Sequence, residues 1–473
     1  MSKKSKHLEV KWMEQPLIKD FLGKRVHIIG ISGASLCGLA ELLREKGYQV
    51  TGSDRAENIF TPYLRKMGID FTIGHDEKNA EGADLVVYSG AVPETNPELA
   101  YARKNGIPVM ERATLLGQIM AAYPVAIGIS GCHGKTTITS MIGKILLDAG
   151  LDATIHAGGV LDYLGGGGTR VGAGGIFLTE ACEYLDSFLR FAPTIAVINN
   201  IDDDHLDYFT GGIEQIYQSF KKFAGLVPGS GAVFCCGDEP LVRRLMGELG
   251  RKCTAYGLLP ENDYTAKNIS YNDYGCASFT VLCKGAPLGR VELSIPGDYN
   301  IVNALAAISV AMYLGVAFDI ISKSLSDYQC AERRFQYHGS VDGVKVYHDF
   351  AHHPSAVKAC LRAARKFKFN KLWVVFQCNS FSRAKKLFDK FVEAFDEADS
   401  IIIAEIFPGR EVDTGIIHGR DMAKAIAARG KEAVYIATFE EIRDYLKPRW
   451  KPGDMVLMVG SGNINQHVWK ILV

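Results

Sequence analysis

The chain has 473 residues, and at about 100–200 residues per domain this length predicts two to four domains. Its 53 basic and 53 acidic side chains cancel, which excludes a broad basic surface for nucleic acid and an acidic tail. An anionic ligand must therefore be bound by a few residues at one site rather than by the overall charge. The 49 glycines indicate several turns whose shape the backbone sets.

Neither a secretion signal nor a membrane span is expected. Glu9, Lys11 and Glu14 interrupt the basic N-terminal segment before an apolar core of signal-peptide length can form. The longest apolar-rich run, between Asn303 and Asp319, is shorter than the ~20 residues that cross a bilayer. Eleven cysteines without a CxxC pair indicate reduced thiols. We expect a cytoplasmic protein, a monomer or homodimer, without membrane or nucleic-acid partners.

The first domain is predicted from a strand at 25–30, a glycine-rich turn and a helical pattern that Gly47 ends. A second strand pattern leads to Asp54. This order is typical of a Rossmann-like beginning, and further strand and helix patterns continue to residue 122. We therefore predict a Rossmann-like domain over residues 1–122.

The strongest local motif follows the apolar strand 125–130 and precedes a helical pattern at 138–150. It reads Gly131-Cys132-His133-Gly134-Lys135-Thr136-Thr137. Its glycines admit phosphate oxygens to backbone N–H groups, the lysine neutralises phosphate charge and a threonine hydroxyl can bind Mg²⁺. Ile129 stands where the longer form of the motif has its first glycine. The alternative is a glycine-rich helix start beside a surface lysine.

Acidic and imidazole groups follow the next two predicted strands. Glu180 ends the strand pattern 174–180 and Glu183 follows it, and Asp204, His205 and Asp207 come after 194–200. Ligands bind at the carboxyl ends of parallel strands, and Mg²⁺ prefers oxygen ligands. A strand-end glutamate is equally consistent with a helix N-cap or a solvated charge, so this reading remains open.

The rest of the chain divides into a central domain over 123–334 and a C-terminal domain over 335–473. The central domain includes a less regular stretch at 230–295 and a helix that Asn300 is expected to cap and Gly315 to end. Strand patterns at 344–350, 371–377, 400–407 and 454–460 alternate with helical ones in the last domain. The glycine-rich segment 165–175 is predicted to be a loop.

Taken together, these motifs resemble the Mur ligase family over about residues 25–465. The blocks that carry the resemblance include GISGASLCG, GCHGKTT, TEACEYLDSF, NNIDDDHLDYF, PGDYNIVNALAA, HDFAHHPSAVKA and FPGRE. The resemblance implies an α/β protein of three domains: a Rossmann-like UDP-sugar domain, a central phosphate-loop ATPase domain with a mostly parallel sheet, and a Rossmann-like C-terminal domain on the amino-acid side.

The implied reaction is ATP-dependent amide formation with Mg²⁺, in which L-alanine is joined to UDP-N-acetylmuramate through an acyl phosphate. It belongs to peptidoglycan precursor synthesis, and so to cell-wall growth, cell shape and division. Two alternatives remain open: a paralogue that joins another amine or peptide to a UDP-sugar acid, and a non-catalytic nucleotide-binding relative. A dehydrogenase would leave GCHGKTT unexplained.

The resemblance also implies residue roles. Those for ATP are Gly131, His133, Gly134, Lys135, Thr136, Thr137, Asn300, Asn303, Arg334 and Asp349; those for the metal are Thr136, Glu180 and His205; those for the UDP-sugar are Gly30, Gly33, Gly38 and Asp54. Lys135 and His205 are the catalytic candidates, together with Arg383, which we expect to bind the amino-acid carboxylate because a guanidinium pairs with it in a bidentate fork. The alternative is that Arg383 is a solvated helix residue.

Several positions depart from the family pattern. Ser32 and Ser35 replace glycines, so we expect a cost in stability or crowding of the diphosphate. Phe350 and Asn379 replace a tyrosine and a histidine and cannot form the same hydrogen bonds. From these two changes we predict that L-alanine is used poorly or that another amine is preferred. The remaining departures are Cys132, Tyr299, His348 and the Gly-Ser-Gly-Asn block ending at Asn463.

Overall fold

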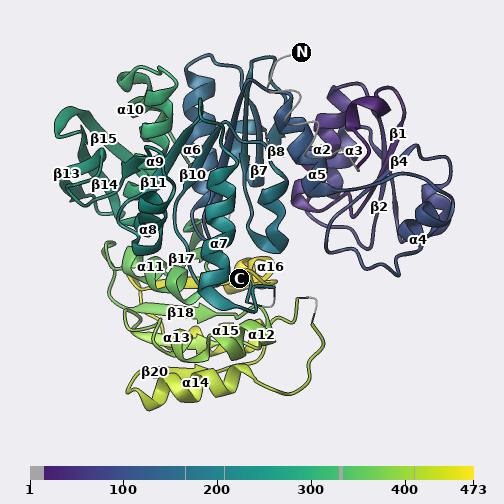
Figure 1. The fold of residues 1–473 in the computed structure, drawn as a ribbon. Coiled ribbons are helices and arrows are strands. Elements are labelled where there is room, and N and C mark those ends of the chain that lie inside the picture. The colour runs from purple at the N-terminus through teal and green to yellow at the C-terminus, as the bar shows by residue number, and fades with distance from the viewer. Residues whose placement is uncertain (1–14, 166, 207, 330–333, 410, 473) are drawn as a thin grey trace. The chain divides into compact units, whose positions relative to one another are not determined.

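The computed structural model describes residues 15–165, 167–206, 208–329, 334–409 and 411–472 (Figure 1). The chain folds into three α/β domains, each built around one sheet. Its contacts group into two compact units: residues up to Asp202 with Gly211–Tyr264 and Ala306–Ile321, and Asp203–Thr210 with Thr265–Leu305 and the chain from Ser322. The basic N-terminal segment with Glu9 lies outside the described residues, and so does Asp207.

The N-terminal sheet is parallel, with the strand order β3-β2-β1-β4-β5. The predicted Rossmann-like architecture is thus confirmed, and Gly47, at φ +90°, follows the helix that it was expected to end. The elements are η1 (Ile18–Phe21), β1 (Arg25–Ile29), α2 (Ala34–Glu45), β2 (Gln49–Asp54), α3 (Thr61–Lys66), β3 (Asp70–Ile73), η2 (Glu77–Ala80), β4 (Leu85–Tyr88), α4 (Pro97–Lys104), β5 (Val109–Glu111) and α5 (Arg112–Ala121).

The central sheet contains, in the first unit, the order β12-β11-β10-β6-β9-β7-β8. Its pairs are parallel except β7–β8, which confirms the mostly parallel sheet. The elements are β6 (Val125–Ser130), α6 (Lys135–Asp148), β7 (Thr154–Leu161), η3 (Asp162–Leu164), β8 (Gly167–Arg170), β9 (Ile176–Glu180), η4 (Tyr184–Arg190), β10 (Ile195–Ile198), α7 (Gly212–Gly225), β11 (Ala232–Cys236), α8 (Pro240–Glu248) and β12 (Thr254–Tyr256).

The prediction of a loop over 165–175 was wrong for Gly167–Arg170, which forms strand β8, whereas residues 171–175 lie outside the helices and strands as expected. A Cβ at Gly167 would lie 2.6 Å from the Tyr63 hydroxyl, and one at Gly168 would lie 2.6 Å from the Gly159 carbonyl oxygen. Here glycine therefore allows close packing of a strand on its neighbours, a use that composition alone does not distinguish from flexibility.

The stretch at 230–295 is more regular than expected. Beyond β12 it contains β13 (Tyr264–Tyr271), β14 (Cys276–Cys283) and β15 (Ala286–Pro296), and β14 pairs antiparallel with β15. Helices α9 (Tyr299–Tyr313) and α10 (Phe318–Ser326) follow, with Gly315 at φ +82° after α9 as expected. Asn300 is not an N-cap: it lies inside α9, and its side-chain amide donates to the Pro296 carbonyl oxygen at 2.7 Å.

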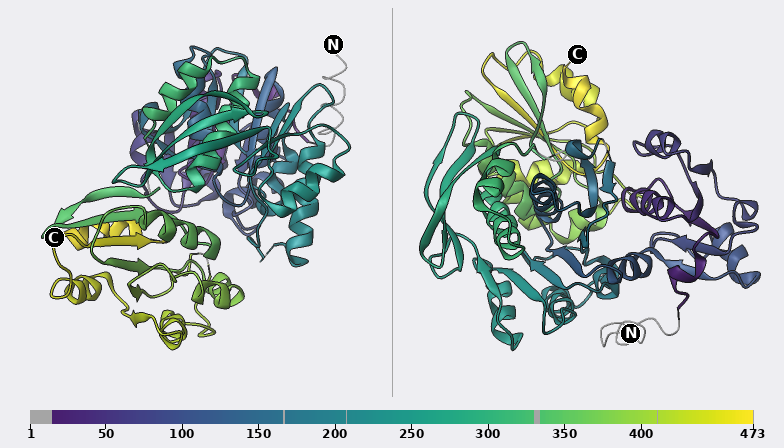
Figure 2. Two further views of the ribbon diagram at one scale, coloured as in Figure 1. Left: turned by 90° about the vertical axis from the view of Figure 1, so that its left-hand side faces the viewer. Right: turned by 90° about the horizontal axis from the view of Figure 1, so that it is seen from above.

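The C-terminal sheet has the order β16-β17-β21-β18-β19-β20, parallel except for β16–β17. Along β21, Met455, Leu457 and Val459 join one hydrophobic cluster while Val456 and Met458 join another, as the alternation of a strand requires. Both faces of the sheet are therefore buried under helices (Figure 2).

The elements of this last domain are β16 (Gln336–Val341), β17 (Val344–Asp349), α11 (Pro354–Ala364), β18 (Leu372–Phe376), α12 (Phe381–Lys386), α13 (Phe388–Val392), β19 (Ser400–Ile403), α14 (Gly419–Ala428), β20 (Glu432–Tyr435), α15 (Phe439–Leu446), β21 (Met455–Val459) and α16 (Ile464–Leu472). Among the described residues of the whole chain, no helix is both long enough and apolar enough to cross a membrane. The residue limits predicted for the three domains remain predictions.

Candidate active site

The phosphate loop, Gly131–Thr137, joins β6 to α6 as the sequence predicts. Gly131 has φ +143° and Gly134 has φ +84°, so the backbone at both positions favours glycine. Gly134 is the N-cap of α6 and supplies no side-chain cap. The first N–H groups of this 14-residue helix can therefore bind an anion beside the positive end of the helix dipole.

Lys135, the first residue of α6, is a largely buried cation, with 15% of its side chain exposed. Its Nζ lies 2.9 Å from the Glu183 Oε2, and the Glu183 side chain is 1% exposed. Burial by itself lowers the pKa of the lysine, but the Glu183 carboxylate and the nearby Cys182 and Cys132 thiols outweigh it and raise the pKa. The ammonium therefore stays charged and is held at the loop before any phosphate arrives.

Thr136 and Glu180 form an oxygen-rich corner beside the same loop. The Thr136 hydroxyl donates to the Glu180 Oε2 at 3.1 Å, and the Gly158 N–H donates to the Glu180 Oε1 at 2.5 Å. A hydroxyl and a carboxylate are the hard oxygen ligands that Mg²⁺ takes, with water and phosphate completing its shell. The residues present in this corner fit the expected metal.

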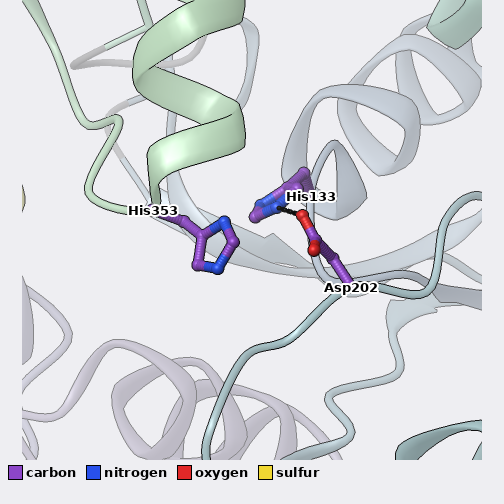
Figure 3. Close-up of side chains that lie close together, drawn as sticks. All are labelled: His133, Asp202 and His353. Atoms are coloured by element: carbon purple, nitrogen blue, oxygen red, sulfur yellow. Dashed lines mark hydrogen bonds and ion pairs between the residues drawn. The ribbon is translucent and has the colours of Figure 1, made fainter. Parts of the chain in front are cut away.

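Two asparagines that the sequence analysis did not single out fix the shape of the loop. The Asn200 Oδ1 accepts from the His133 N–H at 2.8 Å, and the amide groups of Asn199 and Asn200 both donate to the His133 carbonyl oxygen. The His133 ring also reaches Asp202, 3.2 Å away (Figure 3). The signal that could have found them is their position directly after β10, next to β6 in the sheet.

In the second unit, Asp204 and Arg383 form a buried ion pair. The Arg383 Nη2 lies 3.1 Å from the Asp204 Oδ1, and the same guanidinium donates to the Asn379 carbonyl oxygen at 2.5 Å. Burial raises the pKa of Asp204, but His205, Arg383, His352 and His353 outweigh it, and the net shift is downward. Arg383 is therefore not a solvated helix residue. Its guanidinium is oriented by a permanent anion.

The expected nucleotide residues of the second unit lie in two clusters. Asn303 donates to the Asn300 Oδ1 at 3.0 Å near the start of α9. Asp349 is buried and accepts from the Phe335 and Ala351 N–H groups, and burial raises its pKa although Arg334 opposes the change. The roles assigned to these residues remain predictions, and Asp349 already has a structural role at the end of β17.

The glycine-rich turn of the N-terminal domain differs from expectation at its serines. Ser32 and Ser35 are not among the residues with positive φ, so the predicted backbone cost does not arise there. The Asp54 Oδ2 accepts from both the N–H and the hydroxyl of Ser32, at 2.9 and 2.5 Å. Gly30 has φ +79°, and a Cβ at Gly33 would lie 3.2 Å from the Gly30 carbonyl oxygen. The glycines that the turn needs are present.

Two departures from the family pattern contact each other in the C-terminal domain. The Asn379 amide donates to the Ser461 hydroxyl at 3.2 Å. Glu411 holds the same segment, because it accepts from the Ser382 N–H at 2.9 Å and from the Ser380 hydroxyl. Asn379 therefore has a hydrogen-bond partner that is itself a departure from the family pattern.

A phosphate loop in the central one of three α/β domains, flanked by carboxylates at strand ends, defines an enzyme class that uses a nucleoside triphosphate. The chain belongs to the Mur ligase family. The family models for the catalytic domain, the middle domain and the glutamate ligase domain match residues 25–124, 175–311 and 333–462.

Three proteins similar to this chain are ligases that act on UDP-N-acetylmuramate. The chain is 46% identical over 442 residues to the UDP-N-acetylmuramate–L-alanine ligase of Acetivibrio thermocellus, covering 93% of this chain and 94% of that protein. It is 45% identical over 441 residues to the enzyme of that name from Caldanaerobacter subterraneus, covering 93% and 95%. The crystal structure of UDP-N-acetylmuramate–alanine ligase from Thermotoga maritima matches with a TM-score of 0.80 and 25% identity, covering 95% of this chain and 98% of that one.

Proposed function

We propose that this protein joins L-alanine to UDP-N-acetylmuramate, with hydrolysis of ATP to ADP and phosphate, in peptidoglycan precursor synthesis. The observation that carries the proposal is the phosphate loop with Lys135 held on Glu183, in a chain more than 40% identical to ligases of that name. In the reaction, the lactyl carboxylate attacks the γ-phosphorus and ADP leaves. The alanine amine then attacks the acyl carbon, loses a proton, and phosphate leaves.

Lys135 and the start of α6 carry the first step in this proposal. Negative charge develops on phosphoryl oxygens as the carboxylate attacks, and a preorganised ammonium with helix N–H groups stabilises it without reorganisation. When phosphate binds, Lys135 exchanges part of its contact with Glu183 for the phosphate. Asn199 and Asn200 keep the His133 backbone in place during that exchange.

Mg²⁺ is the proposed cofactor, and Thr136 and Glu180 are its proposed ligands in the first unit. Bound there, the ion would neutralise charge on the phosphoryl oxygens. Glu183 is a further carboxylate at the same loop, already paired with Lys135. His205, the remaining metal-site candidate, lies 3.8 Å from Asp204 in the second unit. Its role stays a proposal that a His205→Ala variant tests.

Arg383 is the proposed site for the amino-acid carboxylate. Asp204 and the Asn379 carbonyl oxygen orient its guanidinium, which leaves further N–H groups for a bidentate contact. The pairing of Asn379 with Ser461 removes one of the two reasons for expecting another amine. L-alanine is therefore the amine that we propose.

The decisive experiment incubates the purified protein with ATP, Mg²⁺, UDP-N-acetylmuramate and each of the twenty amino acids. Phosphate release and the mass of the UDP product are measured together. We expect one phosphate per amide formed, with L-alanine the best substrate. A product of different mass would reassign the amine, and ATP hydrolysis without any coupled product would overturn the proposal.

A further inference from the structure

A chain of hydrogen bonds connects the start of α2 to strands β7 and β8. The Arg112 Nη1 donates to the Ser35 Oγ at 3.1 Å, the Ser35 Oγ lies 2.9 Å from the His156 Nε2, and the His156 Nδ1 lies 3.0 Å from the Thr169 Oγ1. His156 and Thr169 are buried, with 3% and 2% of their surface exposed. Neither His156 nor Thr169 belongs to the proposed sites for ATP, Mg²⁺ or the amino acid.

The chemistry of the four groups sets the direction of this chain. An arginine can only donate, so the Ser35 oxygen accepts from it, and the one hydroxyl proton of Ser35 is free to point at the His156 Nε2. Burial, with Arg112 nearby, lowers the pKa of His156 to about 3, so the ring is neutral and can accept there. The ring hydrogen then sits on Nδ1 and is donated to Thr169.

Packing at Gly38 brings the members of the chain into reach. A Cβ built at Gly38 would lie 2.0 Å from the Thr169 Oγ1 and 2.9 Å from the His156 Nδ1. Helix α2 therefore rests directly on β7 and β8, and only glycine fits at the contact. In β8 itself, Gly167 and Gly168 also have close neighbours, since a Cβ at either would lie 2.6 Å from the Tyr63 hydroxyl or the Gly159 carbonyl oxygen.

At its other end the chain holds a cation at the start of α2. In the part of the chain that the structure describes, no carboxylate forms an ion pair with Arg112. The helix begins after Gly33, which supplies no side-chain cap, so its first N–H groups are open to an anion. Among the described residues, Arg112 thus has no carboxylate partner, and it lies beside a helix N-terminus without a side-chain cap.

We infer that His156 is a positioning residue for the UDP-sugar: by accepting from Ser35 it holds Arg112 at the start of α2, where Arg112 contacts the diphosphate. This inference rests on the proposed function. Thr169 orients the histidine ring by accepting from its Nδ1–H. His156 itself touches neither ATP nor the reacting carboxylate, so its effect is confined to binding of the UDP-sugar.

The test replaces His156 by leucine, which removes the acceptor, and by glutamine, whose amide can accept from Ser35 and donate to Thr169. We expect His156→Leu to raise the KM for UDP-N-acetylmuramate about tenfold, the effect of weakening one hydrogen bond to a charged group, with kcat and the KM for ATP within about twofold. His156→Gln should recover most of the loss. The matched control is Tyr163→Phe, which removes another partly buried hydrogen bond of the same domain, to the Ser140 carbonyl oxygen.

A double-mutant cycle separates positioning from general destabilisation. If His156 acts through Ser35, His156→Leu combined with Ser35→Ala should bind the UDP-sugar no more weakly than Ser35→Ala alone. The inference would be overturned if the double variant lost affinity by the product of the two single losses. It would also be overturned if His156→Leu bound the UDP-sugar within twofold of the wild type. If His156→Leu does not fold, Thr169→Val replaces it in the comparison. We expect Thr169→Val to raise the KM for UDP-N-acetylmuramate about threefold, and an unchanged KM would count against the inference.

Direct calorimetry with UDP-N-acetylmuramate alone distinguishes this inference from the proposed function. Wild-type protein that does not bind the UDP-sugar would remove both. Wild-type protein that binds it, with equal binding by His156→Leu, would leave the proposed function standing and remove only the role of His156.

Discussion

The two glycine-rich loops of the first unit share one local design and differ in where the cation is anchored. Each follows a parallel strand, uses glycine at positive φ and leads into a helix without a side-chain cap. In the phosphate loop the cation is Lys135, the first residue of the helix, paired with Glu183. Beside the loop at Gly30–Gly33, the cation is Arg112 of α5, whose guanidinium donates to the Ser35 hydroxyl.

The two loops therefore share a backbone geometry that suits an anion, and we propose that the cation beside each loop decides its use. A lysine built into the loop can follow a phosphoryl group as its charge changes. In our proposal, an arginine anchored on a separate helix holds the diphosphate of the UDP-sugar, which does not react. Substitutions that alter one loop and leave the other intact can therefore test the two roles separately.

The largest effect is expected at the phosphate loop. Lys135→Met should lower kcat by roughly 10²–10³, because one preorganised electrostatic contact to the developing charge is lost. The variant should also unfold more easily, since Glu183 is left as a buried unpaired carboxylate, a loss of roughly 3 kcal/mol. The matched control is Lys144→Met, whose pair with Asp148 lies on the outer side of the same helix. Turnover within a few-fold of wild type would rule out the proposed role.

The second prediction concerns acid stability of the N-terminal domain. Glu98 is fully buried and accepts from His27 at 3.0 Å and from Ser53 at 2.6 Å. Burial raises its pKa, but these bonds and that of Asn79 outweigh it and lower the pKa to about 2. Because the folded pKa lies below the unfolded value, the stabilisation is present above pH ~4.5 and is lost as the pH falls towards 2.

Unfolding measured across this pH range should therefore show a loss of about 3 kcal/mol in the wild type and a flatter profile in Glu98→Gln. Glu57→Gln is the control, since Glu57 is exposed on the same domain and pairs with Arg65 at the surface. Identical pH profiles for wild type and Glu98→Gln would show that the buried carboxylate is not the acid-sensitive group.

The third prediction tests the contact between Gly38 of α2 and strands β7 and β8. Gly38→Ala should destabilise the protein by about 1–3 kcal/mol, because the added methyl overlaps the Thr169 hydroxyl and α2 must shift. It should also weaken UDP-sugar binding while leaving ATP binding unchanged. Gly225→Ala, at the end of α7 with open space around the new atom, is the matched control. Thermal unfolding and calorimetry check both parts, and unaltered unfolding would contradict the packing.

The smallest effect is expected on the amino-acid side. Phe350→Tyr with Asn379→His restores the family pattern, but Asn379 already bonds to Ser461, so we expect the kcat/KM for L-alanine to change less than about threefold. From the sequence alone, a larger rise in the kcat/KM for L-alanine would be expected, because both substitutions restore the family pattern. A tenfold or greater rise would return support to the hypothesis that this chain uses L-alanine poorly.

The motifs made much of this protein predictable. The strand, GCHGKTT and helix in register predicted the phosphate loop, because glycine spacing and an adjacent lysine act locally along the chain. Alternating strand and helix patterns likewise predicted the Rossmann-like ends and the mostly parallel central sheet. In contrast, the strand at Gly167–Arg170 was not predicted, because composition cannot distinguish a flexible glycine from one packed closely against a neighbouring strand.

Partnerships between distant residues needed the tertiary structure. Three hydrogen bonds join residues far apart in the sequence: Asn200 with His133, 67 positions apart, Ser461 with Asn379, 82 apart, and His156 with Ser35, 121 apart. No periodicity or spacing in the sequence marks these pairs, because each depends on which strands and helices come to lie together. The sequence by itself determined which residues could bind phosphate, and the tertiary structure decided which cation, carboxylate or hydroxyl each of them meets.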